Sequence, residues 1–195
     1  MKLMKKIILA SSSKHRKKLL NQLKIKFSTI SPDIDESRKR NESVDEYVKR
    51  LSIEKARKVA GENKNAIIIG SDEVAVVDKK ILGKPLKKIN AVKQLKMISN
   101  KSVIFKTGLC VIDTQTNKQY SSVTNYKIKV KKLNNNEILS YINKEDILNC
   151  AGSIKLEGLA IAIVEKAYGY DPTSVIGLPL IKLRVYLSKM GVEIL

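Results

Sequence analysis

The segment from residue 65 to residue 78, NAIIIGSDEVAVVD, is an apolar, strand-like run that two acidic residues interrupt. A short run of mostly β-branched apolar residues is typical of a buried strand. A carboxylate is costly to bury unless it is paired with a cation or bound to a metal. Asp72 and Glu73 therefore mark either a turn or bulge between two strands, or the place of a functional site.

The remaining sequence alternates between strand-like and helix-like patterns. Residues 43–61 form the clearest helix pattern, because Ser43 and Glu46 make a capping box at its start and Gly61 follows its last turn. Two β-rich runs on either side of residues 114–118 predict a hairpin. We expect strands over residues 5–10, 24–32, 65–70, 74–78, 102–113, 120–130 and 158–170, and helices over 14–23, 43–61, 89–99, 135–143 and 177–191. This order favours an α/β or α+β domain with a mixed sheet.

The chain of 195 residues is long enough for one domain or two closely fused lobes. Its first ten residues, MKLMKKIILA, combine basic charge with an apolar run, as an export signal does, but the run is short and polar residues follow. We interpret it as a first strand. Cys110 and Cys150 are not spaced as a metal-binding pair, and buried free thiols suit a reducing compartment. No segment resembles a membrane span, and we expect a cytoplasmic protein.

The net charge is +19, from 38 basic and 19 acidic residues. Such a charge is typical of proteins that bind nucleic acid. Here the positive charge is mostly lysine and is spread along the whole chain, as compositional drift in an AT-rich genome would also produce. Few aromatic residues lie between the lysines, so the sequence offers poor stacking surfaces for single-stranded nucleic acid. We therefore do not expect nucleic acid as the partner, although a preference for polyanions stays open.

Four polar stretches stand where a fold alone does not require them: SSSKHR at 11–16, DIDE at 33–36, GSDEV at 70–74 and ILGKPL at 81–86. Each has a plain structural explanation as a helix cap, a solvated loop or a turn. Together they supply carboxylates for a hard divalent cation, and basic side chains and helix-start N–H groups for phosphate. This combination indicates cleavage or transfer of a phosphoryl or nucleotidyl group. The sequence has no P-loop or dinucleotide-binding fingerprint, and a Ser-His-Asp triad would depend on its single histidine, His15.

These stretches resemble the motifs of the Maf family of nucleotide pyrophosphatases. The family opens with a strand and an L-A-S-x-S-P-R-R-like loop, and LASSSKHR occupies that place at residues 9–16. The segments DIDE, YVKRLSIEKA, IIGSDEV, ILGKPL and VIGLPLIKL follow in the family's order, so that the resemblance extends from Ile8 to about Leu187. It implies a mixed α/β fold similar to that of inosine triphosphatases, with an elongated sheet flanked by helices, a cleft between two lobes and a single domain over residues 1–195.

The resemblance also implies a reaction. Maf proteins hydrolyse a nucleoside triphosphate between its α and β phosphates, with Mg²⁺ or Mn²⁺, to a monophosphate and pyrophosphate. GSDEV and LEGL resemble the branch linked to 7-methyl-GTP, although Lys14 replaces its usual proline, His15 an aromatic residue that is typically tryptophan, and Glu73 a glutamine. The alternatives are a UTP or dTTP pyrophosphatase of the same family, and a basic nucleic-acid-binding module that keeps the fold without catalysis. A homodimer is compatible with each.

The resemblance assigns roles to individual residues. Asp72 is the expected general base, which orients or deprotonates the attacking water. Glu36 and Asp72 are the expected metal ligands, and Asp33 or Asp35 can join them. The expected substrate contacts are Ser11, Ser13, Arg16, Lys55 and Lys84 with the triphosphate, and His15, Glu73 and Glu157 with the base. Carboxylates at the base can accept the N1–H and N2–H donors of guanine, and their charge favours a methylated, cationic ring.

Overall fold

The computed structural model describes residues 5–195, and in this range one sheet is surrounded by helices. The strands are β1 (Lys6–Ala10), β2 (Ser28–Ile30), β3 (Ala66–Val77), β4 (Lys80–Leu82), β5 (Ser102–Asp113), β6 (Gln119–Val130) and β7 (Val164–Gly169). The helices are α1 (Lys14–Asn21), α2 (Val44–Ala60), α3 (Lys88–Ile98), α4 (Asn135–Lys144) and α5 (Leu180–Lys189), with 3-10 turns η1 (Ala151–Ser153), η2 (Leu159–Ala162) and η3 (Pro172–Ile176). Residues 1–4 of the segment that resembles an export signal lie outside the described residues, and β1 occupies residues 6–10 of it.

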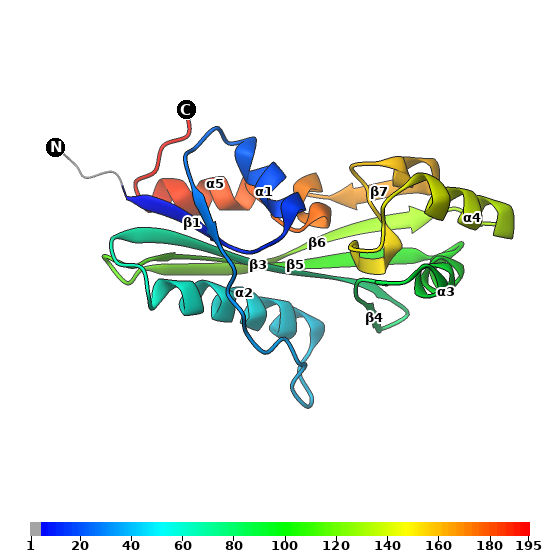
Figure 1. Cartoon of the computed structure of the whole chain (residues 1–195), viewed down its shortest axis with the longest axis horizontal. Helices are drawn as coiled ribbons and strands as arrows, with labels where there is room; N and C mark the ends of the chain where they lie inside the picture. Colours follow the sequence, from blue (N-terminus) through cyan, green and yellow to red (C-terminus); the bar gives the residue numbers. More distant parts are fainter. Residues whose placement is uncertain (1–4) are drawn as a thin grey trace.

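The strands form one mixed sheet in the order β2-β1-β3-β5-β6-β7, with β4 added beside β3. β1 pairs in parallel with β2 and β3, whereas the pairs β3–β4, β3–β5, β5–β6 and β6–β7 are antiparallel. The long strands β3, β5 and β6 have 12 residues each and give the molecule its elongated shape (Figure 1). The predicted mixed α/β fold with an elongated sheet flanked by helices is confirmed.

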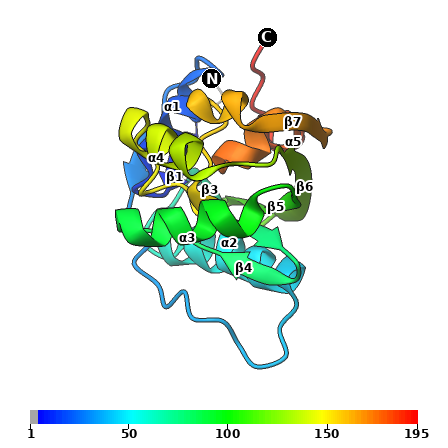
Figure 2. The ribbon, with the colours of Figure 1, turned by 90° about the vertical axis from the view of Figure 1, so that its right-hand side faces the viewer.

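Helices cover both faces of the sheet. Figures 1 and 2 show α2 along one face and α1 and α5 on the opposite face, with α3 and α4 at the far end. Ala56 and Val59 of α2 pack against Ile68 on the first face, and Leu20 and Leu187 are buried on the second. A third apolar cluster, built mainly from β6, α3 and α4, fills the far end. Among residues 5–195, no helix is both long and apolar enough to cross a membrane.

Two glycines allow α2 to approach the sheet closely. A Cβ atom on Gly70 would lie 2.2 Å from the carbonyl oxygen of Ser52, and one on Gly108 would lie 2.1 Å from that of Val48. Both distances are far inside van der Waals contact, so a larger residue at either position would push the helix away. Gly70 in β3 and Gly108 in β5 therefore set the depth at which α2, with Lys55, lies on the sheet.

The strand β3 passes through Asp72 and Glu73 without a break. Its pairing with β5 is continuous over residues 67–76. The alternative of a turn or bulge at these acids is therefore wrong. The strand tolerates Asp72 because this carboxylate forms an ion pair with Lys55. β3 turns instead after Val77, at Asp78–Lys79, where both residues have positive φ, as a two-residue hairpin turn requires.

Two other strand predictions differ from the structure. Only residues 28–30 of the predicted strand 24–32 pair in the sheet, as β2. The predicted strand 158–170 is divided into η2 and the shorter β7. Ala160 and Ile163 turn into the core from η2 and its end, so this apolar run packs as a helical turn. The hairpin of β5 and β6 is confirmed, and so are the five helices, with ends that differ by at most three residues.

Candidate active site

The candidate site lies in the middle of β3, where the strand that pairs with one side of β3 changes from β1 to β4. On this edge β1 pairs with β3 as far as Gly70, and β4 begins to pair at Ala75. Within the described part of the chain, residues 71–74 have no strand beside them on this edge. Asp72 lies in this opening. Figure 1 shows β3 extending from the end of the sheet that carries α1 to the end that carries α3 and α4.

Lys55 connects the acids of two predicted motifs. Its Nζ atom lies 2.5 Å from Asp72 Oδ1 and 2.8 Å from Glu36 Oε1. Lys55 and Asp72 are buried, whereas the Glu36 side chain is 59% exposed. Tyr47, absent from the predicted set, donates a hydrogen bond from its hydroxyl to the carbonyl oxygen of Glu36 at 2.9 Å. The fold thus brings together the expected general base, an expected metal ligand and an expected phosphate contact.

The cations around Glu36 favour its charged form. Partial burial by itself raises the pKa of Glu36. The hydrogen bond and charge of Lys55, with the charges of Arg16 and Lys84, outweigh burial and hold the pKa below its usual value. The carboxylate is therefore ionised at neutral pH, as a metal ligand has to be.

Glu36 and Asp72 are the two carboxylates that approach one another here, through the lysine that they share. Asp35 forms a local turn instead, because its carboxylate accepts hydrogen bonds from the backbone N–H and the hydroxyl of Ser37, both at 2.8 Å. Over residues 5–195, no three His, Cys, Asp or Glu side chains lie close enough to hold a metal ion. Neither Asp33 nor Asp35 therefore joins the pair in a cluster of three.

The serine-rich loop forms both a helix cap and a cluster of polar groups. Ser13 Oγ accepts the backbone N–H of Arg16 at 3.4 Å and caps α1. The buried Ser11 Oγ accepts the backbone N–H of Ser13 at 3.1 Å and Arg16 Nη1–H at 3.3 Å. The capping role of serine is therefore present. Phosphate binding by Ser11, Ser13 and Arg16 stays a prediction.

Gly177 connects this loop to β3. Arg16 donates from Nε to the carbonyl oxygen of Gly177 at 2.8 Å, and Ser71 Oγ lies 2.9 Å from the same oxygen. Gly177 has a φ of +102°, and a Cβ atom there would lie 3.1 Å from Glu73 Oε2 and 3.2 Å from Arg16 Nε. Glycine suits both this backbone conformation and this narrow space. Glu73 and Arg16 therefore lie close to the same point beside Gly177.

Asp171, also absent from the predicted set, holds the segment that carries Gly177. Its buried carboxylate accepts the backbone N–H of Thr173 at 3.0 Å and that of Ile181 at 2.7 Å. These bonds connect η3 to the start of α5. An aspartate before Pro172 is a turn signal that the sequence already contains. Its bond to Ile181 depends on the fold.

Burial changes the protonation of Glu73. It raises the pKa of Glu73 to about 8, the charge of Arg16 opposes this effect, and the charges of Asp72 and Glu157 add to it. Glu73 is therefore mostly protonated at neutral pH and offers one hydrogen-bond donor and one acceptor. In this form its side chain is neutral, like that of a glutamine.

His15 and Glu157 meet across the two ends of the molecule. His15 Nδ1, on α1, lies 2.8 Å from Glu157 Oε1, on the loop between η1 and η2, although 142 positions separate the two residues. Two of the three residues expected at the base therefore contact each other. Lys84 is exposed, and its charge acts on both Glu36 and Glu73.

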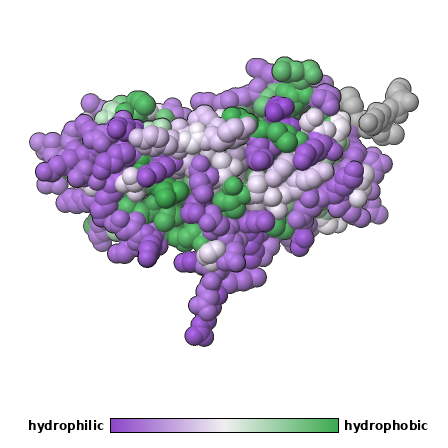
Figure 3. Space-filling view, turned by 180° about the vertical axis from the view of Figure 1, so that it is seen from behind, coloured by the Kyte–Doolittle hydropathy of each residue, from purple (hydrophilic) through white to green (hydrophobic). Residues whose placement is uncertain are grey.

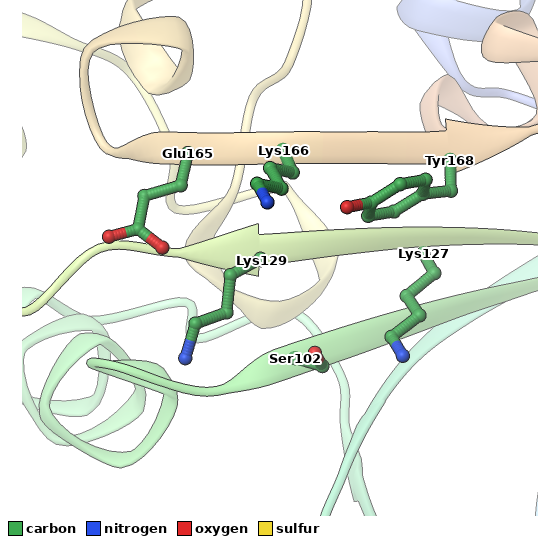
Figure 4. A pocket seen from close by; sticks show the side chains of 6 residues that line it. All are labelled: Ser102, Lys127, Lys129, Glu165, Lys166 and Tyr168. Atoms are coloured by element: carbon green, nitrogen blue, oxygen red, sulfur yellow. The ribbon is translucent and has the colours of Figure 1, made fainter.

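Two hollows in the surface lie away from these residues. One, of about 440 Å³, is lined by Ser102, Lys127, Lys129, Glu165, Lys166 and Tyr168, from β5, β6 and β7 (Figure 4). The other, of about 500 Å³, is lined by residues between 39 and 53. The candidate site is defined here by its convergent acids and cations, and a cleft at this place stays a prediction.

A mixed sheet with two carboxylates, a buried lysine and an arginine–serine loop around its centre defines an α/β protein equipped to act on phosphate groups. The chain matches the family described as Maf-like protein over residues 6–190, and it belongs to this family. It is 45% identical to the 7-methyl-GTP pyrophosphatase of Colwellia psychrerythraea over 192 residues, which cover 98% of this chain and 96% of the relative.

Two further relatives carry the same name. The chain is 46% identical to the 7-methyl-GTP pyrophosphatase of Pseudoalteromonas translucida over 189 residues, 97% of this chain and 94% of the relative. It is 43% identical to that of Pseudomonas aeruginosa over 188 residues, 96% of this chain and 98% of the relative. The resemblance that the sequence motifs indicate is confirmed.

Proposed function

We propose that this chain is a nucleoside triphosphate pyrophosphatase, which hydrolyses the α–β phosphoanhydride of 7-methyl-GTP or a related modified nucleotide to the monophosphate and pyrophosphate. The observation that carries the proposal is the convergence of Asp72, Glu36 and Lys55 in the opening beside β3. Membership of the Maf family and the names of relatives at 43–46% identity support the reaction and the substrate.

In this proposal Asp72 orients the attacking water and takes its proton. The ion pair with Lys55 and the continuous strand β3 hold the carboxylate in place, which a general base requires. Water attacks one phosphorus of the α–β linkage, and the bridging oxygen leaves with the electron pair of the broken bond. The phosphates are bound by Ser11, Ser13, Arg16, Lys55 and Lys84, because hydroxyls, helix-start N–H groups and cations neutralise their charge.

A divalent cation such as Mg²⁺ or Mn²⁺ fits Glu36 and Asp72. Both carboxylates already approach one cationic group, the Lys55 ammonium, so the oxygens that a hard cation prefers converge here. In nucleotide sites, Mg²⁺ typically takes one or two protein carboxylates and completes its shell with water and phosphate oxygens. When bound, such a cation lowers the pKa of a coordinated water and neutralises phosphate charge.

Glu157 selects the base in this proposal, with His15 and Glu73. The Glu157 carboxylate accepts the N1–H and N2–H donors of guanine, and its charge favours the cationic 7-methyl ring. Protonated Glu73 adds a neutral donor and acceptor. His15, 2.8 Å from Glu157, takes the place of an aromatic partner but is a weaker cation–π partner than tryptophan.

We also propose that the chain is a single cytoplasmic domain whose main partner is its nucleotide substrate. We expect a single domain, because β3 and β5 extend through both ends of the molecule. A cytoplasmic location agrees with the free thiols of Cys110 and Cys150. The acids at the site would repel the phosphates of nucleic acid unless a cation intervenes, so we do not expect nucleic acid as a partner. Assembly as a homodimer stays a prediction.

A panel of nucleotides tests the proposed reaction. The purified chain is incubated with 7-methyl-GTP, GTP, UTP or dTTP and with Mg²⁺ or Mn²⁺, and released pyrophosphate is measured. We expect 7-methyl-GTP to be hydrolysed best and excess EDTA to stop the reaction. A preference for UTP or dTTP would contradict the base assignment alone. Salt-sensitive binding of nucleic acid without turnover of any nucleotide would favour the alternative of a nucleic-acid-binding module without catalysis.

The substitution Glu157→Gln tests base selection directly. Glutamine keeps one acceptor, places a donor opposite the donors of guanine and removes the charge. Mismatched polar groups cost about 1–3 kcal/mol each, so the preference for 7-methyl-GTP over UTP should fall by about one to two powers of ten. Glu165→Gln, at an exposed glutamate of β7, is the matched control and should leave the preference unchanged. An unchanged preference in Glu157→Gln would exclude Glu157 from base selection.

A further inference from the structure

The residues Lys155–Leu159, which we call the Glu157 loop, are held by one side chain of a different element. Glu145 stands at the C-terminal end of α4. Its Oε1 atom lies 2.5 Å from Lys155 Nζ, and its Oε2 atom accepts the backbone N–H of Leu159 at 2.8 Å. The two oxygens of one carboxylate therefore hold the first and the last residue of the loop.

Gly158 shows how closely the loop wraps around this carboxylate. A Cβ atom on Gly158 would lie 2.3 Å from Glu145 Oε2, so any other residue would displace either the loop or Glu145. The Glu145 side chain is 15% exposed, which means that water does not readily replace its partners. The glycine of the LEGL motif thus makes room for a carboxylate that lies outside the motif.

Further contacts fix the loop on the same side. The Tyr141 hydroxyl, one turn earlier on α4, accepts the backbone N–H of Lys155 at 3.2 Å. Leu156 and Leu159 pack against the apolar cluster at this end of the molecule. Glu157, between them, reaches instead to His15 on α1 at the other end. The two ends of the loop are therefore held by residues at the end of α4, while its central residue, Glu157, points to the candidate site.

Contacts with the loop also stabilise the charged form of Glu145. The hydrogen bonds from Lys155 and from the Leu159 backbone lower the pKa of Glu145 by more than burial raises it. Within residues 5–195, Glu145 forms no hydrogen bond or ion pair with Asp72, Glu36 or Lys55, which form the catalytic cluster. Its contacts are those of a residue that acts on the shape of the loop.

We infer that Glu145 is a positioning residue for base selection: it holds the Glu157 loop in the conformation that presents the Glu157 carboxylate to the base. This inference rests on the proposed function for the role of Glu157. Small displacements of a positioned group cost large factors in rate or selectivity. Loss of the Glu145 contacts should therefore change which nucleotide is preferred, while the chemical step at Asp72 continues.

The test compares Glu145→Gln with Glu137→Gln. Glu137 is a matched control, because it lies at the other end of α4, pairs with Lys131 at 2.8 Å and accepts a backbone N–H in a capping box. In Glu145→Gln we expect the ratio of kcat/KM for 7-methyl-GTP over UTP to fall by about tenfold or more, mainly through a higher KM for 7-methyl-GTP. Glu137→Gln should leave the ratio unchanged.

Hydrogen exchange on the same variants, without nucleotide, separates this inference from the proposed function. We expect the amides of residues 155–162 to exchange faster in Glu145→Gln and at the parent rate in Glu137→Gln. Unchanged exchange, or faster exchange with an unchanged nucleotide ratio, would overturn the inference. Absence of turnover in the parent chain would instead contradict the proposed function, and faster exchange would still support the anchoring role of Glu145.

A second variant covers the case in which Glu145→Gln does not fold. Lys155→Met removes one of the two contacts and leaves the bond from the Leu159 backbone to Glu145. We expect a smaller loss of selectivity in the same direction, again with faster exchange in the loop. Equal selectivity in Lys155→Met and the parent, together with faster exchange, would contradict the positioning role.

Discussion

At the scale of single residues, Lys55 makes it possible to place a carboxylate inside an apolar strand. Asp72 is buried and lies 2.5 Å from the Lys55 ammonium, which also contacts Glu36. Removal of one partner of a buried ion pair is costly because the other charge is left uncompensated. Here the second acid remains to pair with the lysine. A neutral residue at position 72 can therefore be used to test chemistry in a folded protein.

Asp72→Asn should remove most turnover and keep the fold. Asparagine preserves the shape of the side chain but cannot take a proton from water, and loss of a positioned general base typically costs about 10²–10⁴-fold in rate. Pyrophosphate release measures the loss, and circular dichroism checks the fold. Asp78→Asn, at an exposed acid paired with Lys101 directly before β5, is the control. Turnover within a few-fold of the parent would exclude Asp72 as the base.

Glu73→Gln should stabilise the protein at high pH. Burial raises the pKa of Glu73 to about 8 from a usual value of 4.5, so the folded chain binds the proton more tightly than the unfolded chain. A raised acidic pKa means that the free energy of unfolding falls as the pH rises between these two values. Glutamine stays neutral and removes this loss.

Urea unfolding from about pH 5 to about pH 9 measures the effect. The stability of Glu73→Gln relative to the parent should increase with pH through this range and level off above about pH 8. Glu62→Gln, at an exposed acid after α2, is the control, and its stability should change with pH in the same way as that of the parent. A constant difference between Glu73→Gln and the parent at every pH would contradict the raised pKa.

At the scale of elements, the approach of α2 to the sheet brings Lys55 to Asp72. The two residues lie on different elements, and the distance between the elements is set by Gly70 and Gly108 rather than by large side chains. Asp72 is directly opposite Gly108 in the ladder between β3 and β5. A change of packing at this glycine therefore acts on the ion pair at close range.

Gly108→Ala should lower both stability and activity. The added Cβ atom would lie 2.1 Å from the Val48 carbonyl oxygen, and overpacking of this kind costs about 1–3 kcal/mol. Denaturant unfolding and pyrophosphate release measure the two effects. Gly61→Ala, at the end of the same helix, is the control, because its nearest atoms would be 3.7 Å away. Equal stability of Gly108→Ala and the parent would show that α2 does not depend on this contact.

At the scale of the whole molecule, one long strand has a free edge. β6 pairs with β7 only from Tyr126 onward, so residues 119–125 are unpaired on that side within the described part of the chain. Their sequence, QYSSVTN, has no charged residue in a chain with a net charge of +19. Elsewhere hydrophilic side chains cover much of the surface seen in Figure 3. Proteins usually protect free edges with charges, so an uncharged one favours pairing with another strand.

We therefore expect a homodimer in which two copies of this segment pair in antiparallel fashion about a two-fold axis. Asn125→Lys should shift the chain to monomer in light scattering, because a charged side chain on the edge opposes pairing. Gln115→Lys, in the exposed loop of the same hairpin, adds the same charge away from the edge and should leave the dimer intact. The dimer should strengthen with added salt, which screens the repulsion between two positive chains. A parent chain that is monomeric at high salt would contradict this prediction.

Elements whose signals lie close together in the chain were predictable from the sequence. The capping box of Ser43 and Glu46 starts α2, and the two β-rich runs on either side of a short polar loop form the hairpin of β5 and β6. Such signals act over a few residues, where the backbone has few alternatives. The order of the polar motifs also indicated the family and the reaction, because each motif keeps its local residue pattern.

The continuity of β3 and the partners of its acids followed instead from contacts between distant segments. Asp72 stays in an unbroken strand because β5 supplies the ladder and α2 supplies Lys55, and neither is visible in the local pattern around the acids. The bond between His15 and Glu157 and the hold of Glu145 on the Glu157 loop likewise join elements that are far apart in the chain. Pairing of this kind depends on sheet register and on the depth of helix packing. These are set by the balance of the whole core, which no short stretch of sequence contains.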